Sequence, residues 1–159
     1  MPGKLQAEIR QTRPFSLIEE EAALNIIRTA EVLQRFIADF LRPFDLSPVQ
    51  YNVLRILRGA GAAGATCSQI GERLLARDPD ITRLLDRMQA RDLIERERSS
   101  EDRRVVITRI SNTGLALVDS IDQPLRSVNK GKLGKFGREA LADLIAGLER
   151  VREAYEEEA

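Results

Sequence analysis

Residues 66–110 read TCSQIGERLLARDPDITRLLDRMQARDLIERERSSEDRRVVITRI, and this stretch decides the fold. Thr66 can cap a short helix that runs to about residue 75, and Asp78 can cap a second helix that runs to about residue 91. Two short helices in tandem, the second amphipathic and bearing arginines, are typical of a helix-turn-helix. The side chains expected to face the core are Ile70, Leu74, Leu75, Ile81, Leu84, Leu85 and Met88.

The hydrophobic period changes after the second helix. Residues 94–98 and 103–110 are rich in β-prone side chains, and a polar turn at 99–102 separates them. This pattern predicts a hairpin whose tip carries arginines on both sides of the turn. A helix-turn-helix followed by an arginine-tipped hairpin is a winged helix, and the combination is more specific than either half.

Long helices are expected on both sides of this lobe. Apolar residues recur at steps of three and four along 17–41 and along 138–156, which gives each helix a continuous apolar stripe. Ser47 begins a further helix, Pro124 is expected to bend the helix after the hairpin, and the glycine- and lysine-rich segment 130–137 is expected to be a connection. The fold class is therefore mainly α with a small β-hairpin wing.

Composition excludes several classes of function. The chain has 25 basic and 25 acidic residues, and a formal net charge of zero argues at first sight against binding nucleic acid. The absence of histidine excludes histidine-dependent triads, HExxH zinc sites and imidazole pH switches, and a single cysteine excludes a disulfide framework. We therefore expect no enzyme, no cofactor and no metal. Without a signal peptide or membrane span, we expect a cytoplasmic protein.

Several motifs resemble those of the MarR family of bacterial transcription regulators. They are LSPVQY (46–51), SQIGERL (68–74), ITRLLDRM (81–88), DLIER (92–96), EDRR (101–104) and ISNTG (110–114). The similarity extends over about residues 20–155. The resemblance implies a homodimer in which the first and last helices intertwine. The two winged helices of this dimer would bind a pseudo-palindromic operator in double-stranded DNA. Repression of transcription is the expected outcome.

This resemblance divides the chain into three parts. Residues 1–16 would be a flexible N-terminal arm, 17–45 and 112–156 a helical dimerisation region, and 46–111 a winged helix-turn-helix DNA-binding lobe. The apolar stripes on the helices at 17–41 and 138–156 favour a dimer independently, because a domain this small would struggle to cover them. The alternative is that the two helices cover each other within one chain.

In a winged helix the start of the second helix enters the major groove, where an arginine can bind guanine through two hydrogen bonds. Asp80 can instead hold an arginine, and each polar residue at a helix start can be a plain cap. We expect Arg91 on a salt-bridged outer face. By resemblance, Asp102 braces Arg104, and one wing arginine enters the minor groove. The candidate DNA contacts are Ser47, Gln50, Thr66, Ser68, Gln69, Arg77, Asp80, Thr82, Arg83, Arg98, Asp102, Arg103 and Arg104.

Many members of the family release DNA when a small aromatic or phenolic molecule binds between the lobe and the dimer helices. An aromatic cluster at helical spacing is, however, more often core than pocket. Cys67 is expected to be a small buried residue, although a helix start can activate a thiol. The candidate effector contacts are Phe36, Phe40, Arg42, Phe44, Tyr51 and Leu54.

A second function is a winged-helix module that binds protein without binding DNA. Residues 77–104 contain eight arginines and eight acidic residues, so this segment is neutral, unlike most DNA-binding surfaces. Binding to a DNA duplex that weakens with salt would distinguish the two functions.

Overall fold

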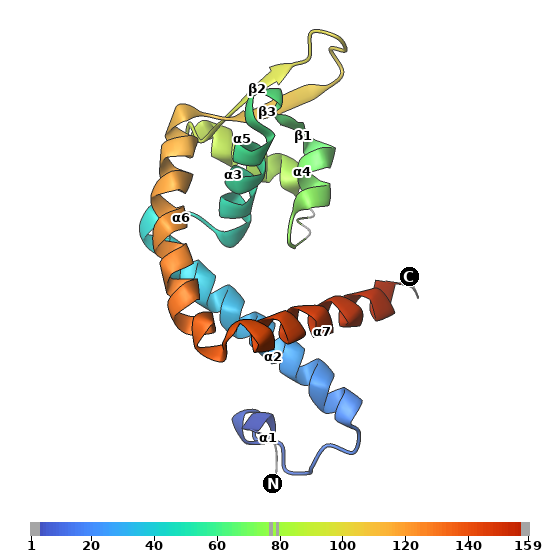
Figure 1. The fold of residues 1–159 in the computed structure, drawn as a ribbon. Coiled ribbons are helices and arrows are strands. Elements are labelled where there is room, and N and C mark those ends of the chain that lie inside the picture. Colours follow the sequence, from blue (N-terminus) through green and yellow to red (C-terminus); the bar gives the residue numbers. More distant parts are fainter. Residues whose placement is uncertain (1–3, 77, 79, 157–159) are drawn as a thin grey trace.

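The computed structural model describes residues 4–76, 78 and 80–156 (Figure 1). It is mostly helical, with one three-stranded antiparallel sheet in the order β1-β3-β2, so the expected fold class is confirmed. In these ranges no helix combines the length and the apolar character needed to cross a lipid bilayer. The elements in chain order are α1 (Lys4–Glu8), α2 (Ile18–Leu41), η1 (Arg42–Phe44), α3 (Pro48–Ala60), η2 (Gly61–Ala63), β1 (Ala65–Thr66), α4 (Cys67–Arg73), α5 (Ile81–Ala90), β2 (Ile94–Arg98), β3 (Val106–Ile110), α6 (Asn112–Leu133), η3 (Gly134–Phe136) and α7 (Arg138–Glu156).

The winged-helix lobe consists of α3, α4, α5 and the sheet, at the top of Figure 1. Aliphatic side chains from all three helices form one core, and α6 contributes to it from the side. Burying these side chains is the main favourable term that holds the lobe together. The fully buried members include Leu54, Leu57, Ile70, Leu85, Met88, Val118 and Ile121.

Local sequence explains where α3 and α4 begin. Ser47 Oγ accepts a hydrogen bond from Gln50 N (3.2 Å), and Gln50 Oε1 accepts one from Ser47 N (2.9 Å). Thr66 and Gln69 form the same reciprocal pair at α4, with distances of 3.2 and 2.9 Å. Each pair is a capping box that satisfies backbone N–H groups left free at a helix start. The N-caps predicted at Ser47 and Thr66 are confirmed.

The end of α4 differs from the prediction. The helix ends at Arg73 rather than near residue 75, and Leu75, which was expected in the core, is 91% exposed. Leu75 N donates a hydrogen bond to Asn52 Oδ1 of α3 (2.9 Å). This contact between residues distant in sequence holds the chain in a non-helical path and turns the leucine side chain outward.

The start of α5 is also corrected. Its N-cap is Asp80, whose carboxylate accepts a hydrogen bond from Arg83 N (3.4 Å), and not Asp78. Asp78 Oδ1 accepts a hydrogen bond from Asp80 N (2.8 Å) and so shapes the turn before the helix. Both aspartates suit a helix start by type, and the choice between them depends on how α5 packs in the lobe. Pro79, predicted at the first helical position, lies outside the described residues.

The hairpin is confirmed. β2 and β3 pair along their length from Ile94 opposite Ile110, although β3 begins at Val106 and the loop is longer than predicted. A third strand, β1, which no sequence pattern indicated, pairs with β3 beside Thr108. A Cβ on Gly64, where φ is +66°, would lie 2.6 Å from Thr108 O, so glycine permits this close approach of two backbones.

α6 is longer than predicted. It begins after Ser111, whose hydroxyl caps it, and continues through Pro124. The prediction that 130–137 forms a connection is wrong, because the helix runs to the middle of this segment and η3 supplies most of the remainder. The Lys132 ammonium lies 5.2 Å from the centre of the Phe36 ring of α2, a cation–π contact that favours the longer helix.

α2 and α7 extend below the lobe in Figure 1, and the rest of the chain leaves much of them uncovered. The chain exposes 12024 Å² of surface, whereas a compact monomer of 17.9 kDa is expected to expose about 8000 Å². The two helices therefore do not cover each other's apolar stripes within one chain. The large apolar side chains left exposed on them include Ile18, Ile27, Val32, Leu33, Leu144, Ile145 and Tyr155.

Part of the expected N-terminal arm is helical. Residues 4–8 form α1, in which Leu5 is buried, and the Glu8 carboxylate lies 3.9 Å from Arg28 Nε of α2. This region is therefore less loose than its polar composition indicated.

Candidate nucleic-acid interface

α5 presents one face to the core and the other to solvent. Its leucines and methionine are buried, whereas Thr82, Arg83 and Arg87 are exposed. Besides capping the helix, the Asp80 carboxylate lies 3.3 Å from Arg83 Nε, and this ion pair holds the guanidinium near the helix start. The exposed face thus presents a hydroxyl and guanidinium groups, which bind base edges and phosphates. Arg77, a further candidate, lies outside the described residues.

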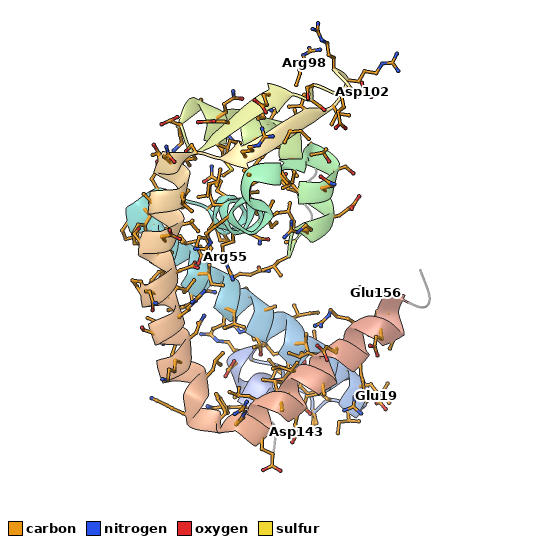
Figure 2. All side chains as sticks on the ribbon, turned by 45° about the horizontal axis from the view of Figure 1, so that its top comes forward. Glu19, Arg55, Arg98, Asp102, Asp143 and Glu156 are labelled. Atoms are coloured by element: carbon orange, nitrogen blue, oxygen red, sulfur yellow. The ribbon has the colours of Figure 1, made fainter. Side chains whose placement is uncertain are left out.

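The wing places its arginines at the outer tip of the hairpin, where Figure 2 labels Arg98 and Asp102. Arg98 Nη1 donates a hydrogen bond to the Arg103 carbonyl (3.2 Å). Asp102 Oδ1 accepts one from Arg104 N (2.9 Å), so it braces the backbone of Arg104 rather than its guanidinium. The side chains of all three arginines are exposed, and the loop is held by its own hydrogen bonds.

Among the candidate DNA contacts at the starts of α3 and α4, Ser47 and Thr66 are helix caps. Ser47 and Thr66 use their oxygens to accept hydrogen bonds from backbone N–H groups, and Ser68 Oγ donates one to Glu72 Oε1 (3.1 Å). A capping hydroxyl keeps its own hydrogen as a donor. A cap and a phosphate contact are therefore compatible at Ser47 and Thr66, whereas Ser68 is already engaged.

Ion pairs within the lobe neutralise part of its basic charge. Arg91 binds the Asp45 carbonyl (2.6 Å) and carboxylate (3.2 Å), and Arg96 binds Gln89 Oε1 (2.7 Å) and the Asp86 carboxylate. Arg91 is therefore salt-bridged as expected, with an acid that follows α2 and η1. The zero net charge of 77–104 combines these paired arginines with others that are unpaired within the described part of the chain. Those without an ion pair are Arg87, Arg98, Arg103 and Arg104.

The candidate effector residues from α2 and η1 form an aromatic row. Phe36, Phe40 and Phe44 are half-buried, with successive ring centres 6.3 and 6.4 Å apart, and they pack against the core of the lobe. Arg42 is exposed and forms an ion pair with Asp39. The row therefore has a structural role at the junction of α2 and the lobe.

The other two effector candidates lie in the core. Leu54 is fully buried, and the Tyr51 hydroxyl donates a hydrogen bond to Asp122 Oδ1. Asp122 also accepts a hydrogen bond from Arg58 Nη2 (2.5 Å), while Arg58 Nη1 binds Asp119 Oδ1 (2.7 Å). This network joins α3 to α6, and the Tyr51 hydroxyl is engaged inside the protein rather than free to hold a ligand.

The network shifts the titration of both buried groups. Burial raises the pKa of Tyr51 to about 12, and the adjacent Asp122 carboxylate contributes to the rise. Burial alone would raise the pKa of Asp122, but hydrogen bonds from Tyr51 and Arg58 and the charges of Arg58 and Arg55 outweigh it. The pKa of Asp122 is therefore below its ordinary value.

A pH dependence follows from Tyr51. Its neutral form is favoured in the folded protein, so its contribution is complete below the ordinary pKa of 10.0 and is lost as the pH rises through about 12. Between about pH 9 and pH 11, the wild type should lose about 1 kcal/mol more of its free energy of unfolding than Tyr51→Phe. Urea unfolding of both proteins at each pH measures this difference. Parallel pH profiles would contradict it.

Cys67 is a free thiol at the start of α4, and it is half-buried against the core rather than fully buried as expected. Within 4–76, 78 and 80–156, no group of three or more cysteine or carboxylate side chains is arranged to hold a metal ion.

Comparisons with known proteins agree with this geometry. A model of the MarR family matches residues 44–105. The HTH-type transcriptional regulator MhqR of Bacillus subtilis is 32% identical over 76 residues, which are 48% of this chain and 51% of MhqR, so that match spans about half of each protein. The crystal structure of the Staphylococcus aureus MepR–DNA complex is similar in fold, with a TM-score of 0.73 and 20% identity over 82% of this chain and 96% of that one.

A longer match comes from the crystal structure of a MarR transcription factor from Planctomyces limnophilus. It is 37% identical to this chain, with a TM-score of 0.64, and the match covers 89% of this chain and 99% of that one. A match over 89% of this chain extends beyond the winged-helix lobe. The chain belongs to the MarR family of transcription regulators.

Proposed function

We propose that the protein is a sequence-specific regulator that binds a pseudo-palindromic operator in double-stranded DNA as a homodimer and represses transcription. One observation carries the proposal. The exposed face of α5 and the arginine-bearing wing lie on one lobe, while apolar stripes remain uncovered on α2 and α7. One part supplies groups for the major and minor grooves, and the other supplies a surface for a second copy.

The surface area supports the dimer. The chain exposes 12024 Å², roughly 4000 Å² more than a compact monomer of its mass. Obligate dimers bury about 2000–5000 Å² summed over both protomers, or about 1000–2500 Å² from each, so the excess is large enough for such an interface. The excess lies largely on helices with apolar stripes. A second copy covering α2 and α7 would bring two winged helices together, as a two-fold operator requires.

The lobe supports DNA binding despite the zero net charge of residues 77–104. Arg91 and Arg96 form ion pairs with Asp45 and Asp86, whereas Arg103 and Arg104 at the wing form no ion pair among the described residues. Arg83 is held at the start of α5 by Asp80. Non-specific attraction to phosphate should therefore be weak, and recognition should depend on these placed contacts.

Arg83→Ala and Arg104→Ala should affect DNA binding differently. If Arg83 binds a base, its loss should remove about 1–3 kcal/mol of discrimination between operator and random duplex. Loss of Arg104 in the minor groove should weaken binding with less effect on discrimination at the α5 site. Fluorescence anisotropy with both duplexes at two salt concentrations measures this, and Arg150→Ala on α7 is the control.

Two outcomes would correct the proposal. An equal loss on all sequences would make Arg83 a phosphate contact. A folded dimer that binds no genomic duplex at either salt concentration would contradict DNA binding and favour the winged-helix module that binds protein, which the neutral charge of 77–104 suggests.

The regulatory part of the proposal is release from DNA by a small aromatic or phenolic molecule. Phe36, Phe40 and Phe44 form a half-buried row where α2 meets the lobe, so a flat ligand there would separate these two parts. Tyr51 and Leu54 are buried in the core against which this row packs. A ligand at the row should lower the affinity for the operator in the wild type, and Phe40→Ala should reduce this response.

A further inference from the structure

α6 connects the winged-helix lobe to α7. In Figure 1 it descends from the lobe to η3, and its 22 residues correspond to a length of about 33 Å. Leu125 is its last buried residue, and the side chains beyond it are exposed or half-buried. The direction in which α6 leaves the lobe therefore determines where the lobe lies relative to α7.

The start of α6 is attached to the lobe at one point. Ser111 Oγ donates a hydrogen bond to the Asp92 carbonyl (2.6 Å), and Thr113 Oγ1 donates one to Asp92 Oδ2 (2.9 Å). A Cβ on Gly114 would lie 2.1 Å from the Leu93 carbonyl oxygen, so the helix begins in direct contact with the backbone before β2. One attachment point fixes the position of a helix but not its direction.

A second attachment fixes the direction. Asp122 lies about 12 Å beyond Gly114 along the helix axis. Its Oδ1 accepts a hydrogen bond from the Tyr51 hydroxyl, and its Oδ2 accepts one from Arg58 Nη2 (2.5 Å). Both donors belong to α3 of the lobe, and they come from different turns of that helix. Two attachments separated along α6 define its angle to the lobe.

The other contacts between α6 and the lobe constrain its direction less. Val118, Ile121 and Leu125 are buried, but apolar burial has no preferred direction. The aromatic row joins α2 to the lobe through apolar contacts as well. Pro124 has no backbone N–H to donate within α6, which makes the helix easier to bend close to Asp122. The hydrogen bonds of Asp122 therefore act where α6 resists bending least.

For the dimer of the proposed function, on which this inference rests, we propose that Asp122 is a positioning residue that sets the spacing between operator half-sites. Tyr51 and Arg58 hold it, and none of the three is a candidate DNA contact. A tilt of α6 by about 10° would displace its far end by about 6 Å over a length of about 33 Å. Successive base pairs are only about 3.4 Å apart, so a small tilt changes the preferred spacing.

Operators with altered spacing test this role. An operator is selected by the wild type from duplexes of random sequence, and its spacer is lengthened or shortened by one base pair. Each change should weaken wild-type binding about tenfold or more, because the two winged helices no longer reach both half-sites together. For Asp122→Asn the loss should be about threefold or less, and Tyr51→Phe should fall between the two. Fluorescence anisotropy measures each Kd.

Arg126→Gln is the matched control. Arg126 Nη2 lies 3.6 Å from Asp122 Oδ2, but both residues belong to α6, so this ion pair does not connect α6 to the lobe. The variant should keep the wild-type spacing preference. A duplex with a single half-site is the second control, because its Kd should be the same for all variants. A general loss of folded protein would instead weaken binding to every duplex by the same factor, and circular dichroism measures the folded fraction.

The outcomes separate this role from the proposed function. A reduced spacing penalty in Asp122→Asn and Tyr51→Phe, with unchanged binding to the single half-site, would support it. The full wild-type penalty in both folded variants would overturn it and leave the proposed function intact. If Asp122→Asn does not fold, Tyr51→Phe alone decides between these outcomes. A wild type that binds no duplex would overturn the proposed function and this role with it.

Discussion

Asp122→Ala is expected to lower the free energy of unfolding by about 3–5 kcal/mol, because it removes one partner of a buried ion pair. The Asp122 side chain is 7% exposed and accepts hydrogen bonds from the Tyr51 hydroxyl and from Arg58 Nη2 (2.5 Å). Alanine would leave the tyrosine hydroxyl buried without its acceptor and would leave Arg58 with one carboxylate. The lobe and α6 would lose their main polar connection. Urea unfolding at pH 7 and fixed protomer concentration measures the change.

Asp119→Ala is the matched control, because it removes the other carboxylate that binds Arg58. Asp119 is 57% exposed, and its loss should cost less than about 1 kcal/mol. Asp122→Asn should fall between the two, since it keeps an acceptor for Tyr51 and loses the charge. A loss of less than about 1 kcal/mol for both Asp119→Ala and Asp122→Ala would show that the network contributes little to stability.

The same network predicts a loss of stability in acid. The pKa of Asp122 is lower in the folded protein than its ordinary value, so its contribution is complete above the ordinary pKa and is lost as the pH falls through the folded value. The difference in unfolding energy between the wild type and Asp122→Ala should therefore shrink at acid pH.

Features set by neighbouring residues were predictable from sequence. The capping boxes at Ser47 and Thr66 depend on residues three positions apart, and the hairpin after Ile94 depends on two adjacent β-prone runs. The stripes on α2 and α7 follow from helical periodicity. These signals place most helices and the wing, and they place Thr82 and Arg83 on the exposed face of α5.

Features set by contacts between distant segments were not predictable. Tyr51 and Asp122 are 71 residues apart, and no periodic pattern connects them. The two-residue strand β1 is too short to show a period. Leu75 fits a helical stripe, but the hydrogen bond from its backbone N–H to Asn52 takes it out of the helix.

The N-cap of α5, Asp80 rather than Asp78, shows that prediction from sequence can fail even within a single turn. Both precede α5, both can accept a backbone hydrogen bond, and the structure uses both, one in the turn and one as the cap. Propensity identifies the residue type at a helix start, whereas packing selects the position.

Leu144→Asp combined with Ile145→Asp is expected to separate the proposed dimer into monomers. Operator binding should then weaken at least about 100-fold, because linked binding to two half-sites gains about 10²–10⁴ in affinity. The two side chains lie on the apolar stripe of α7 and are 52% and 57% exposed in the single chain. In a dimer they would be covered, and two aspartates there would place unpaired charges in an apolar interface. Light scattering after size exclusion measures the mass, and anisotropy measures operator affinity.

Ala146→Asp is the control, because it adds a negative charge on the opposite side of α7. It should remain a dimer and bind the operator as the wild type does. Circular dichroism distinguishes a folded monomer from an unfolded chain, since the core of the lobe is formed without α7. A folded monomer with wild-type operator affinity would mean that one winged helix is sufficient for recognition. A double variant that stays dimeric would exclude this stripe from the interface, and the surface excess would then have to be covered elsewhere on α2.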